Sequence, residues 1–349
     1  MMPPRRSRYN QVVHKGFGRG AAATLLASLV LLLAAPVRAD DAFDVGPSPV
    51  LNVHLNRGTL DIQTWDRPQV QISSDAPLYV QHLNAAQVDP NIPHQLQVSS
   101  QQVETERGPV TLPAESFVLP ELPGGAHDAI VARGGGHVTI TIPRNTAMVL
   151  AHVRAGHLSI NGYHGIFVAH GRSAGITLDN VGGTGFVESL RGRVVATNST
   201  FDRLRIRTAT GNMLFQGCTS HQIQATSSYG SIVYDNGHFQ PGLARFESEH
   251  GNVALGVRGG AQIGAHSGSG KVISSFQREA NVRGNPATKQ ATVDGGGPVV
   301  TATSHHGSVY LYSGSMNEHP HVRQQLSGSA RLPIRYVGPP QRARRRPPF

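Results

Sequence analysis

Between residues 156 and 275, short alternating segments recur along the chain, and each is led by a glycine. An apolar residue usually stands two and four positions after that glycine, as Met213 and Phe215 do after Gly211. Alternation with a period of two is typical of a strand that buries one of its faces. The leading glycines are Gly156, Gly175, Gly192, Gly211, Gly230, Gly251 and Gly270.

The spacing of these glycines is close to constant, at 19, 17, 19, 19, 21 and 19 residues. A second apolar pair follows at offsets 12 and 14, as Leu204 and Ile206 do after Gly192. Coils stacked about 4.8 Å apart would bury these positions as interior ladders, with glycine at the corner where backbones approach closely. The pattern predicts an all-β fold, a single-stranded parallel β-helix (β-solenoid) with coils of about 19 residues. A sandwich of hairpins would also explain the alternation, but not the matched offsets.

Outside these coils the alternation weakens. Residues 50–73 indicate three strands, and residues 76–136 are rich in Pro, Gln, Gly and Ala, as in a long excursion. Strand character returns at 298–314, which predicts a final coil. The predicted parts are a signal peptide (1–39), N-terminal strands with the excursion (40–136), the β-solenoid domain (137–315) and a basic tail that we expect to be disordered (316–349).

The first 39 residues have the pattern of an export signal. A basic leader precedes an uncharged, mostly apolar run over 21–35, and Val37-Arg38-Ala39 ends the segment as a cleavage site. These 15 residues would rise only about 22 Å as a helix, less than the roughly 30 Å hydrocarbon core. We therefore expect cleavage after Ala39, export to the periplasm or cell surface, and no transmembrane segment in the mature chain. Retention of the signal as an anchor is the alternative.

Positive charge is concentrated at the two ends of the chain. Of the formal net charge of +10, six basic residues lie in the first 39 positions and six in the last 19, without an acid in either, which leaves −2 for the body. A body without basic surplus argues against a nucleic-acid partner. The tail predicts binding to anionic envelope lipid or polysaccharide, with a merely solubilising end as the alternative. Its clustered arginines are Arg342, Arg344, Arg345 and Arg346.

Candidate catalytic groups are few. Cys218 is the single cysteine, so no intramolecular disulfide forms, and its position predicts a place near an interior rung. Polysaccharide-cleaving enzymes need carboxylates that lie close together. Asp179 and Asp235 have similar offsets, but they lie three coils apart, about 14 Å on the rung spacing. No catalytic residue is therefore assigned.

The remaining acids of the coils have simpler interpretations. Glu188 is expected to meet Arg205 or Arg207 of the next coil as a surface ion pair, which contributes little to stability. Glu247 and Glu249 share a face near a corner, where they would either bind a cation or form a solvated edge.

Histidine is abundant, with 18 residues, and several histidines precede glycines. No Cys₂His₂ or HExxH spacing is present, so no metal or other cofactor is assigned. Whether the histidines near the end of the coils bind a metal or are solvated corner residues stays open. They are His305, His306, His319 and His321.

Aromatic residues, which often form sugar-binding platforms, are sparse at 6% of the chain. Tyr310 and Tyr312 share a face opposite Val309 and Leu311, and they are the best exposed pair. The same alternation would also allow that face to be the interior.

Three features resemble a known family. They are the opening NRGTLDIQTWDRPQVQI, the strand TITIPRN before the coils, and the serial rungs of a small residue, glycine and alternating apolar residues. Together they are similar to the bacterial putative-adhesin domains of unknown function, over about residues 45–75 and 137–315. The resemblance implies a right-handed parallel β-helix and a location in the cell envelope.

The sequence thus predicts a non-enzymatic, exported envelope protein that serves as an adhesin-like structural or binding module. The alternative is a β-helix enzyme or binding protein that acts on acidic polysaccharide.

Overall fold

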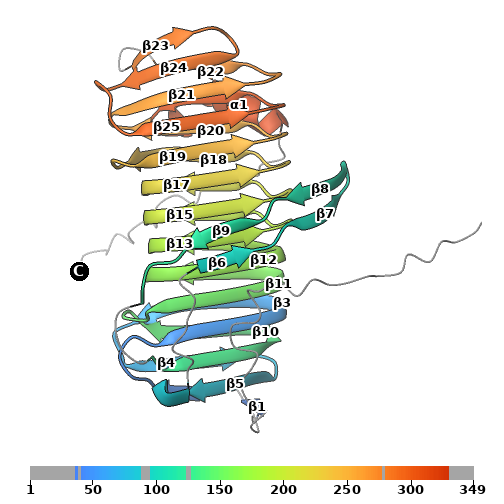
Figure 1. Ribbon diagram of the computed structural model, residues 1–349, viewed down its shortest axis with the longest axis vertical. Coiled ribbons are helices and arrows are strands. Elements are labelled where there is room, and N and C mark those ends of the chain that lie inside the picture. Colours follow the sequence, from blue (N-terminus) through green and yellow to red (C-terminus); the bar gives the residue numbers. More distant parts are fainter. Residues whose placement is uncertain (1–35, 38–40, 88–94, 123–126, 277–279, 330–349) are drawn as a thin grey trace, which may run out of the picture.

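The computed structural model describes residues 36–37, 41–87, 95–122, 127–276 and 280–329. Its strands stack into a column whose interior is apolar (Figure 1). Apart from two single 3-10 turns and one short helix, α1 (Pro320–Ser329), the described elements are strands. Among these residues, no helix is both long and apolar enough to cross a bilayer. The prediction of an all-β, solenoid-like stack is confirmed.

Parallel pairing between successive coils builds the middle of the column. Val194 pairs with Met213, Met213 with Ile232 and Ile232 with Val253, so each coil repeats the register of the one before. The strands of this part are β12 (His164–Asp179), β13 (Gly182–Ser189), β14 (Val194–Thr197), β15 (Thr200–Thr208), β16 (Met213–Gln216), β17 (Thr219–Ser227), β18 (Ile232–Phe239), β19 (Leu243–Ser248) and β20 (Val253–Arg258).

At the N-terminal end of the column, the stacking order departs from the chain order. Strand β3 (Val50–Trp65) lies between β10 (Ala129–Pro143) and β11 (Met148–Asn161), and it pairs in parallel with both. The solenoid therefore does not begin at residue 137, as the sequence indicated. It includes residues 50–65 and 129–136 as well.

The C-terminal end shows the same departure. Strands β25 (Val299–Ser304) and β26 (Val309–Ser313) lie between the β19–β20 coil and the strands β21 (Ala261–Ser267) and β22 (Val272–Ser274). Residues 298–314 form a coil, as the sequence indicated, but this coil lies within the stack and not at its end. Alternation specifies which face of a strand is buried, but not which neighbour it pairs with.

Antiparallel strands finish both ends of the column. At one end β4 (Gln69–Ser74) and β5 (Leu78–Leu83) pair with β10, and β2 (Asp41–Asp44) pairs with β4. The two-residue strand β1 (Pro36–Val37), which precedes the cleavage site expected after Ala39, pairs with β5. At the other end β24 (Thr288–Val293) pairs with β21, and β23 (Ala280–Gly284) pairs with β24. Such end strands cover apolar coil edges that would otherwise meet solvent.

The interior positions follow the offsets that the sequence indicated. After Gly211, the residues at offsets 2, 4, 12 and 14 are all buried. They are Met213, Phe215, Ile223 and Ala225. Cys218 is also buried in this core, and burial raises the pKa of its thiol to about 11. Its predicted place near an interior rung is confirmed.

The leading glycines form a continuous column at one corner. A Cβ atom on Gly230 would lie 1.9 Å from the carbonyl oxygen of Gly211, so no larger residue fits without moving backbone. Gly175 is not part of this column, because Ala174 stands one residue earlier at the matching position. In stacking order the column contains Gly136, Gly58, Gly156, Ala174, Gly192, Gly211, Gly230, Gly251, Gly307 and Gly270.

A buried hydroxyl stands three residues before each of the last six glycines in this column. The Ser248 Oγ accepts a hydrogen bond from the Gly251 N–H at 2.8 Å and donates to the Gly230 carbonyl of the preceding coil at 2.8 Å. A serine or threonine followed by two residues and a glycine is therefore the corner motif, which the glycine spacing alone did not reveal. The hydroxyl residues are Ser189, Thr208, Ser227, Ser248, Ser304 and Ser267.

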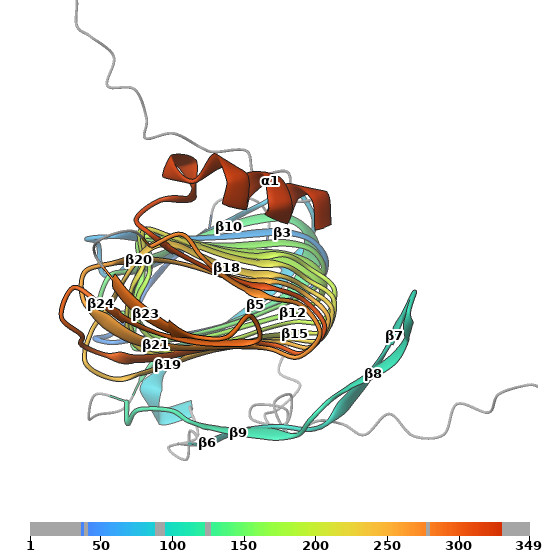
Figure 2. The ribbon, with the colours of Figure 1, turned by 90° about the horizontal axis from the view of Figure 1, so that it is seen from above.

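Part of the predicted excursion folds back onto the column as a bent hairpin over residues 95–118, which we call the arm. Its strands are β6 (Gln95–Val98), β7 (Gln101–Thr105), β8 (Gly108–Leu112) and β9 (Glu115–Val118), after a 3-10 turn η2 (Ala85–Gln87). Seen from above, the arm follows the outside of one wall, whereas α1 covers another wall (Figure 2).

The segment 316–329 is folded, in contrast to the disordered tail expected from residue 316. The turn η3 (Met316–Glu318) and α1 pack Met316, Val322 and Leu326 against Tyr310 and Tyr312. This helix has only a weak signal in the sequence, because its apolar contacts come from only a few residues. Residues 330–349 lie outside the described ranges.

The corner geometry predicts that Gly230→Ala destabilises the protein by about 1–3 kcal/mol, because the added methyl group overlaps the Gly211 carbonyl of the preceding coil. Gly264→Ala is the matched control: it lies in a strand, and its Cβ would meet nothing within 4 Å. Urea unfolding followed by far-UV circular dichroism measures both. Equal stability of the two variants would contradict a steric role for the corner.

Candidate functional site

One column of polar side chains runs along the outside of the wall that the arm covers. Parallel pairing places His54, His152, His170, Glu188 and Arg207 at the same position of five successive coils. We call these five residues the outer column. Because like positions stack in a solenoid, chemically matched side chains come into contact along it.

The side chains of the outer column are in direct contact. The rings of His54 and His152 are stacked with centroids 4.3 Å apart, and the Nδ1 atoms of His152 and His170 lie 2.9 Å apart. The His170 Nε2 lies 2.7 Å from the Glu188 Oε1, and the other oxygen of Glu188 forms an ion pair with Arg207. The sequence predicted Glu188 to meet Arg205 or Arg207, and the structure identifies Arg207.

The Glu188–Arg207 pair is buried rather than on the surface, so that part of the expectation is wrong. Only 1% of the Glu188 side chain and 2% of the Arg207 side chain are exposed. The arm covers them: Gln101 donates to Glu188 at 3.0 Å, and Arg207 donates to the Pro113 carbonyl at 2.6 Å. Removing either partner would leave an uncompensated buried charge, which is strongly destabilising.

Two further arginines of β15 hold the arm beside the outer column. The Arg205 Nε lies 2.9 Å from the Glu115 Oε2, and Arg203 donates to the Val118 carbonyl at 3.1 Å. Apolar contacts add to these: Phe117 packs against Phe186 with ring centroids 5.8 Å apart. The arm is thus fixed by charge, hydrogen bonds and apolar burial together.

Burial changes the titration of the outer column. It lowers the pKa of His152 to about 3, and the neighbouring His170 and His54 act in the same direction. The pKa of His54 is also lowered by burial, then by Arg133 and His170. For Glu188, burial acts to raise the pKa, but the hydrogen bond and charge of His170 and the charge of Arg207 leave it lowered.

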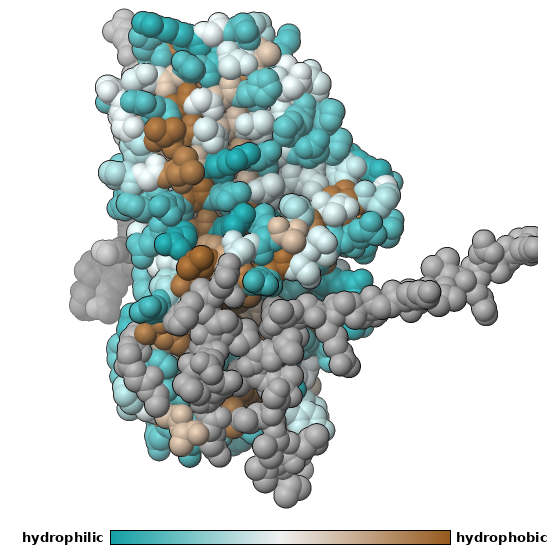
Figure 3. Space-filling view, viewed as in Figure 1, coloured by the Kyte–Doolittle hydropathy of each residue, from teal (hydrophilic) through white to brown (hydrophobic). Residues whose placement is uncertain are grey.

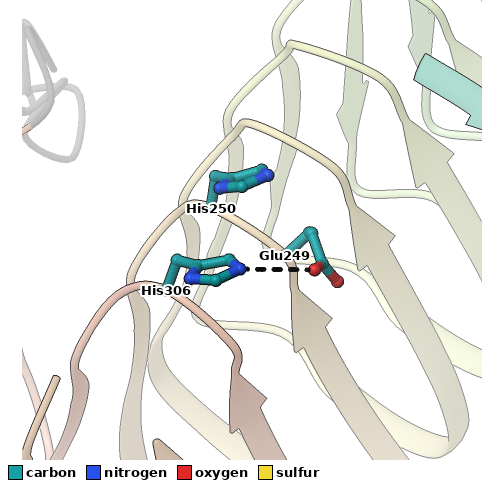
Figure 4. A group of neighbouring side chains, drawn as sticks. All are labelled: Glu249, His250 and His306. Carbon is teal, nitrogen blue, oxygen red and sulfur yellow. Dashed lines mark ion pairs between the residues drawn. The ribbon is translucent and has the colours of Figure 1, made fainter. Parts of the chain in front are cut away.

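A second polar group lies at the glycine corner, further along the column. Glu249, His250 and His306 each offer one ligand atom, and these atoms lie within 4.8 Å of one another. Figure 4 shows the two imidazoles one above the other, with the carboxylate beside them. All three side chains are exposed. Among the described residues, these three form a group that could hold a metal ion.

Only part of the histidine set named from the sequence is brought together. His305 and His306 lie beside Glu247 and Glu249, with the His305 Nε2 3.2 Å from the Glu247 Oε1. His319 and His321 lie elsewhere: His319 contacts the Ser313 carbonyl, and His321 contacts Ser275. The candidate metal ligands chosen from the sequence did not include His250, although it immediately precedes Gly251 just as His306 precedes Gly307.

Asp179 and Asp235, which the repeat predicts to lie three coils apart, are separated in the structure as well. Asp179, Thr197, Gln216 and Asp235 occupy the same position in successive coils, which separates the two carboxylates by three rungs. Asp235 accepts hydrogen bonds from the Tyr312 hydroxyl and the Met316 N–H, and burial raises its pKa. It fixes the segment that leads into α1.

The aromatic residues do not form an exposed platform. Tyr310 and Tyr312 share a face, as the alternation indicated, but α1 covers that face and both are buried. Trp65 borders an open cavity of about 300 Å³ that Arg144 also lines. The Arg67 guanidinium lies 5.0 Å from the centre of the Trp65 ring, so that aromatic surface already has a partner.

The face seen in Figure 3 is mostly hydrophilic, with apolar patches that follow one another along the column. Leu243 and Val299 are neighbours in the register and are 59% and 49% exposed. A single pair of exposed apolar residues is common on protein surfaces.

Several predicted features fall outside the described residues. They are the signal peptide, apart from Pro36–Val37, and the arginines Arg342, Arg344, Arg345 and Arg346.

The stacked parallel coils, the glycine corner and the apolar interior define an all-β, solenoid-like protein. The chain belongs to the Toastrack DUF4097 family, whose profile matches residues 95–311. The resemblance to a family of domains of unknown function is thereby confirmed.

No match is found among curated proteins. The crystal structure of a putative cell adhesion protein from Clostridium sporogenes matches 80% of this chain and 100% of its own, at 11% identity and a TM-score of 0.21. At that TM-score the likeness carries no inference about this chain.

The depressed pKa of His152 predicts loss of stability in mild acid. Its ordinary value is 6.5 and its folded value is about 3, so between these values the unfolded chain takes up the proton and the folded chain does not. The free energy of unfolding should fall by about 1–2 kcal/mol between pH 7 and pH 5. The measurement is urea unfolding across this range.

The variant His152→Gln cannot take up that proton, so it should lose less stability over the same range. His221→Gln, at an exposed position, is the control and should keep the wild-type dependence. An unchanged slope in His152→Gln would show that His152 is not the group responsible.

Proposed function

We propose that this protein is an exported, non-enzymatic module of the cell envelope, with a structural or binding role of the adhesin-like kind. The observation that carries the proposal is the pairing of carboxylates along the arm-covered wall and beside the glycine corner. Glu188 pairs with Arg207, Glu115 with Arg205, and Glu247 with the neighbouring Arg245. Burial acts to raise the pKa of Glu188 and of Glu247, but hydrogen bonds and charges from neighbouring histidine and arginine side chains leave both lowered. A carboxyl group with a lowered pKa is poorly suited to donate a proton to a leaving group.

The filled interior also supports a structural role. Apolar side chains fill the interior ladders from Leu55 to Leu311. The interior of the column is therefore a packed core and is unsuited to holding a substrate. The arm thickens one wall and α1 another. A rigid rod with repeated outward columns presents an extended surface, which suits binding to another large molecule.

The coils are further proposed to form a single-stranded, right-handed β-helix. Crossover connections between parallel strands of one sheet are right-handed in nearly all known cases. A crystal structure of the protein would show a left-handed winding directly if this were wrong.

Export and the absence of catalysis are tested on one sample. The full-length chain is produced in a bacterial host, recovered from outside the cytoplasm, and its N-terminus is sequenced. We expect the mature chain to begin at Asp40, because the leader ends in a cleavage site. The same sample should release no reducing ends or unsaturated products from acidic polysaccharides.

If the protein cleaves an acidic polysaccharide, and replacing one of its carboxylates abolishes that cleavage, the alternative of a β-helix enzyme is favoured. A chain found only in the cytoplasm would contradict export. An intact leader on a membrane-bound chain would favour an anchor over a cleaved signal.

The basic tail is proposed to bind anionic lipid or polysaccharide. Each basic residue near an anionic surface contributes about 1 kcal/mol, and the tail holds a cluster of four arginines. Truncation after Ala330 should weaken co-sedimentation with anionic vesicles, and added salt should weaken binding of the full chain. A second variant replaces Arg342, Arg344, Arg345 and Arg346 with Gln. It removes the charge but keeps the length of the tail, so it separates the effect of charge from that of truncation. Binding that survives both changes would rule the tail out as the contact.

A further inference from the structure

We propose that Glu249, His250 and His306 form a zinc-binding site on the glycine corner. The site lies outside the outer column and the arm, and its existence does not depend on the proposed envelope role. Its ligands are two imidazoles and one carboxylate, each exposed to solvent and therefore accessible to an ion.

The ligand atoms are already close to the positions that zinc requires. The His306 Nε2 lies 3.7 Å from the Glu249 Oε1, and all three ligand atoms fall within 4.8 Å of one another. Zinc bonds of about 2.1 Å in a tetrahedral arrangement place neighbouring ligand atoms about 3.4 Å apart. Rotation of exposed side chains, without backbone movement, closes the remaining distance.

The stacking order of the coils creates this group. His250 and His306 each immediately precede a corner glycine, and Gly307 stacks directly on Gly251. Their rings therefore lie parallel, with centroids 4.6 Å apart and an interplanar angle of 11°. If the coils followed the chain order, Ser269 would occupy the place of His306 beside His250.

Neighbouring residues orient the ligands. The His305 Nε2 lies 3.8 Å from the second oxygen of Glu249 and 3.2 Å from Glu247, which Arg245 holds in turn. Such outer partners fix the direction of a metal-binding carboxylate.

The His250 ring has a partner on its other side. The ring of Tyr229 is stacked on it with centroids 4.5 Å apart, and Arg107, at the tip of the arm, lies over Tyr229. The first imidazole is thus held between two flat rings. Without an ion the His250 ring is therefore stacked on both of its faces, and it or the His306 ring must tilt for the two nitrogen lone pairs to converge on one zinc ion.

The chemistry of the three ligands selects the metal. Ca²⁺ and Mg²⁺ take oxygen ligands, so two imidazoles disfavour both ions. Two histidines and a carboxylate are a ligand set that zinc uses, with the fourth position open to water or to a donor from another molecule. Cu²⁺ binds such ligands more tightly, so the test is made in copper-free solution.

The experiment is equilibrium dialysis of the full-length chain, produced without an affinity tag, against ZnCl₂. We expect one zinc ion to bind per chain. His250→Ala, His306→Ala and Glu249→Gln should each weaken binding at least tenfold. Co²⁺ at the same site should give the visible absorption of a tetrahedral complex, and the three variants should lose it.

The control is the double variant His319→Ala/His321→Ala, which removes two histidines remote from the corner. It should bind zinc as the parent does. Equal weakening in the control, or unchanged binding in His250→Ala and His306→Ala, would overturn the proposal. Far-UV circular dichroism of each variant separates loss of the site from loss of the fold. Failure here would leave the export and glycan results unaffected.

Discussion

The corner hydrogen bonds between a buried hydroxyl and stacked glycines fix the register on which the rest of the column depends. The Oγ atoms of Ser227, Ser248 and Ser304 each tie the glycine of their own coil to the glycine of the coil before it in the stack. A buried hydroxyl and a buried N–H without partners would each cost a few kcal/mol, so a coil shifted by one residue would be penalised at this point. At Gly230 and Gly251 the same corner leaves no room for a Cβ atom, because it would lie 1.9 Å and 2.2 Å from the carbonyl oxygen of the preceding glycine.

A fixed register has chemical consequences on the outside of the column. Side chains at one position of successive coils must contact each other, whether they attract or repel. In the outer column the contact joins histidines to a buried Glu188–Arg207 pair. At the corner the same register places the rings of Tyr229, His250 and His306 in one continuous stack. Both groups arise from the repeat, and neither requires a loop dedicated to function.

Segments distant in the sequence complete both groups. The arm supplies Gln101 and the Pro113 carbonyl to the outer column, and it turns a surface ion pair into a buried one. The C-terminal strands insert between two earlier coils and bring His306 beside His250. The excursion and the late strands are therefore structural parts of the column, and the family profile from 95 to 311 includes both.

The sequence by itself determined the repeat, the buried offsets and the interior place of Cys218, because period-two alternation and glycine spacing are local properties of the chain. It also contained the serine-to-glycine corner motif, which was overlooked. Only the tertiary structure decided the order of the coils, the burial of Glu188 and the cover over Tyr310. All three features depend on which segment packs against which wall of the column. Coils that share one register offer equivalent edges and walls, so only long-range packing selects among them.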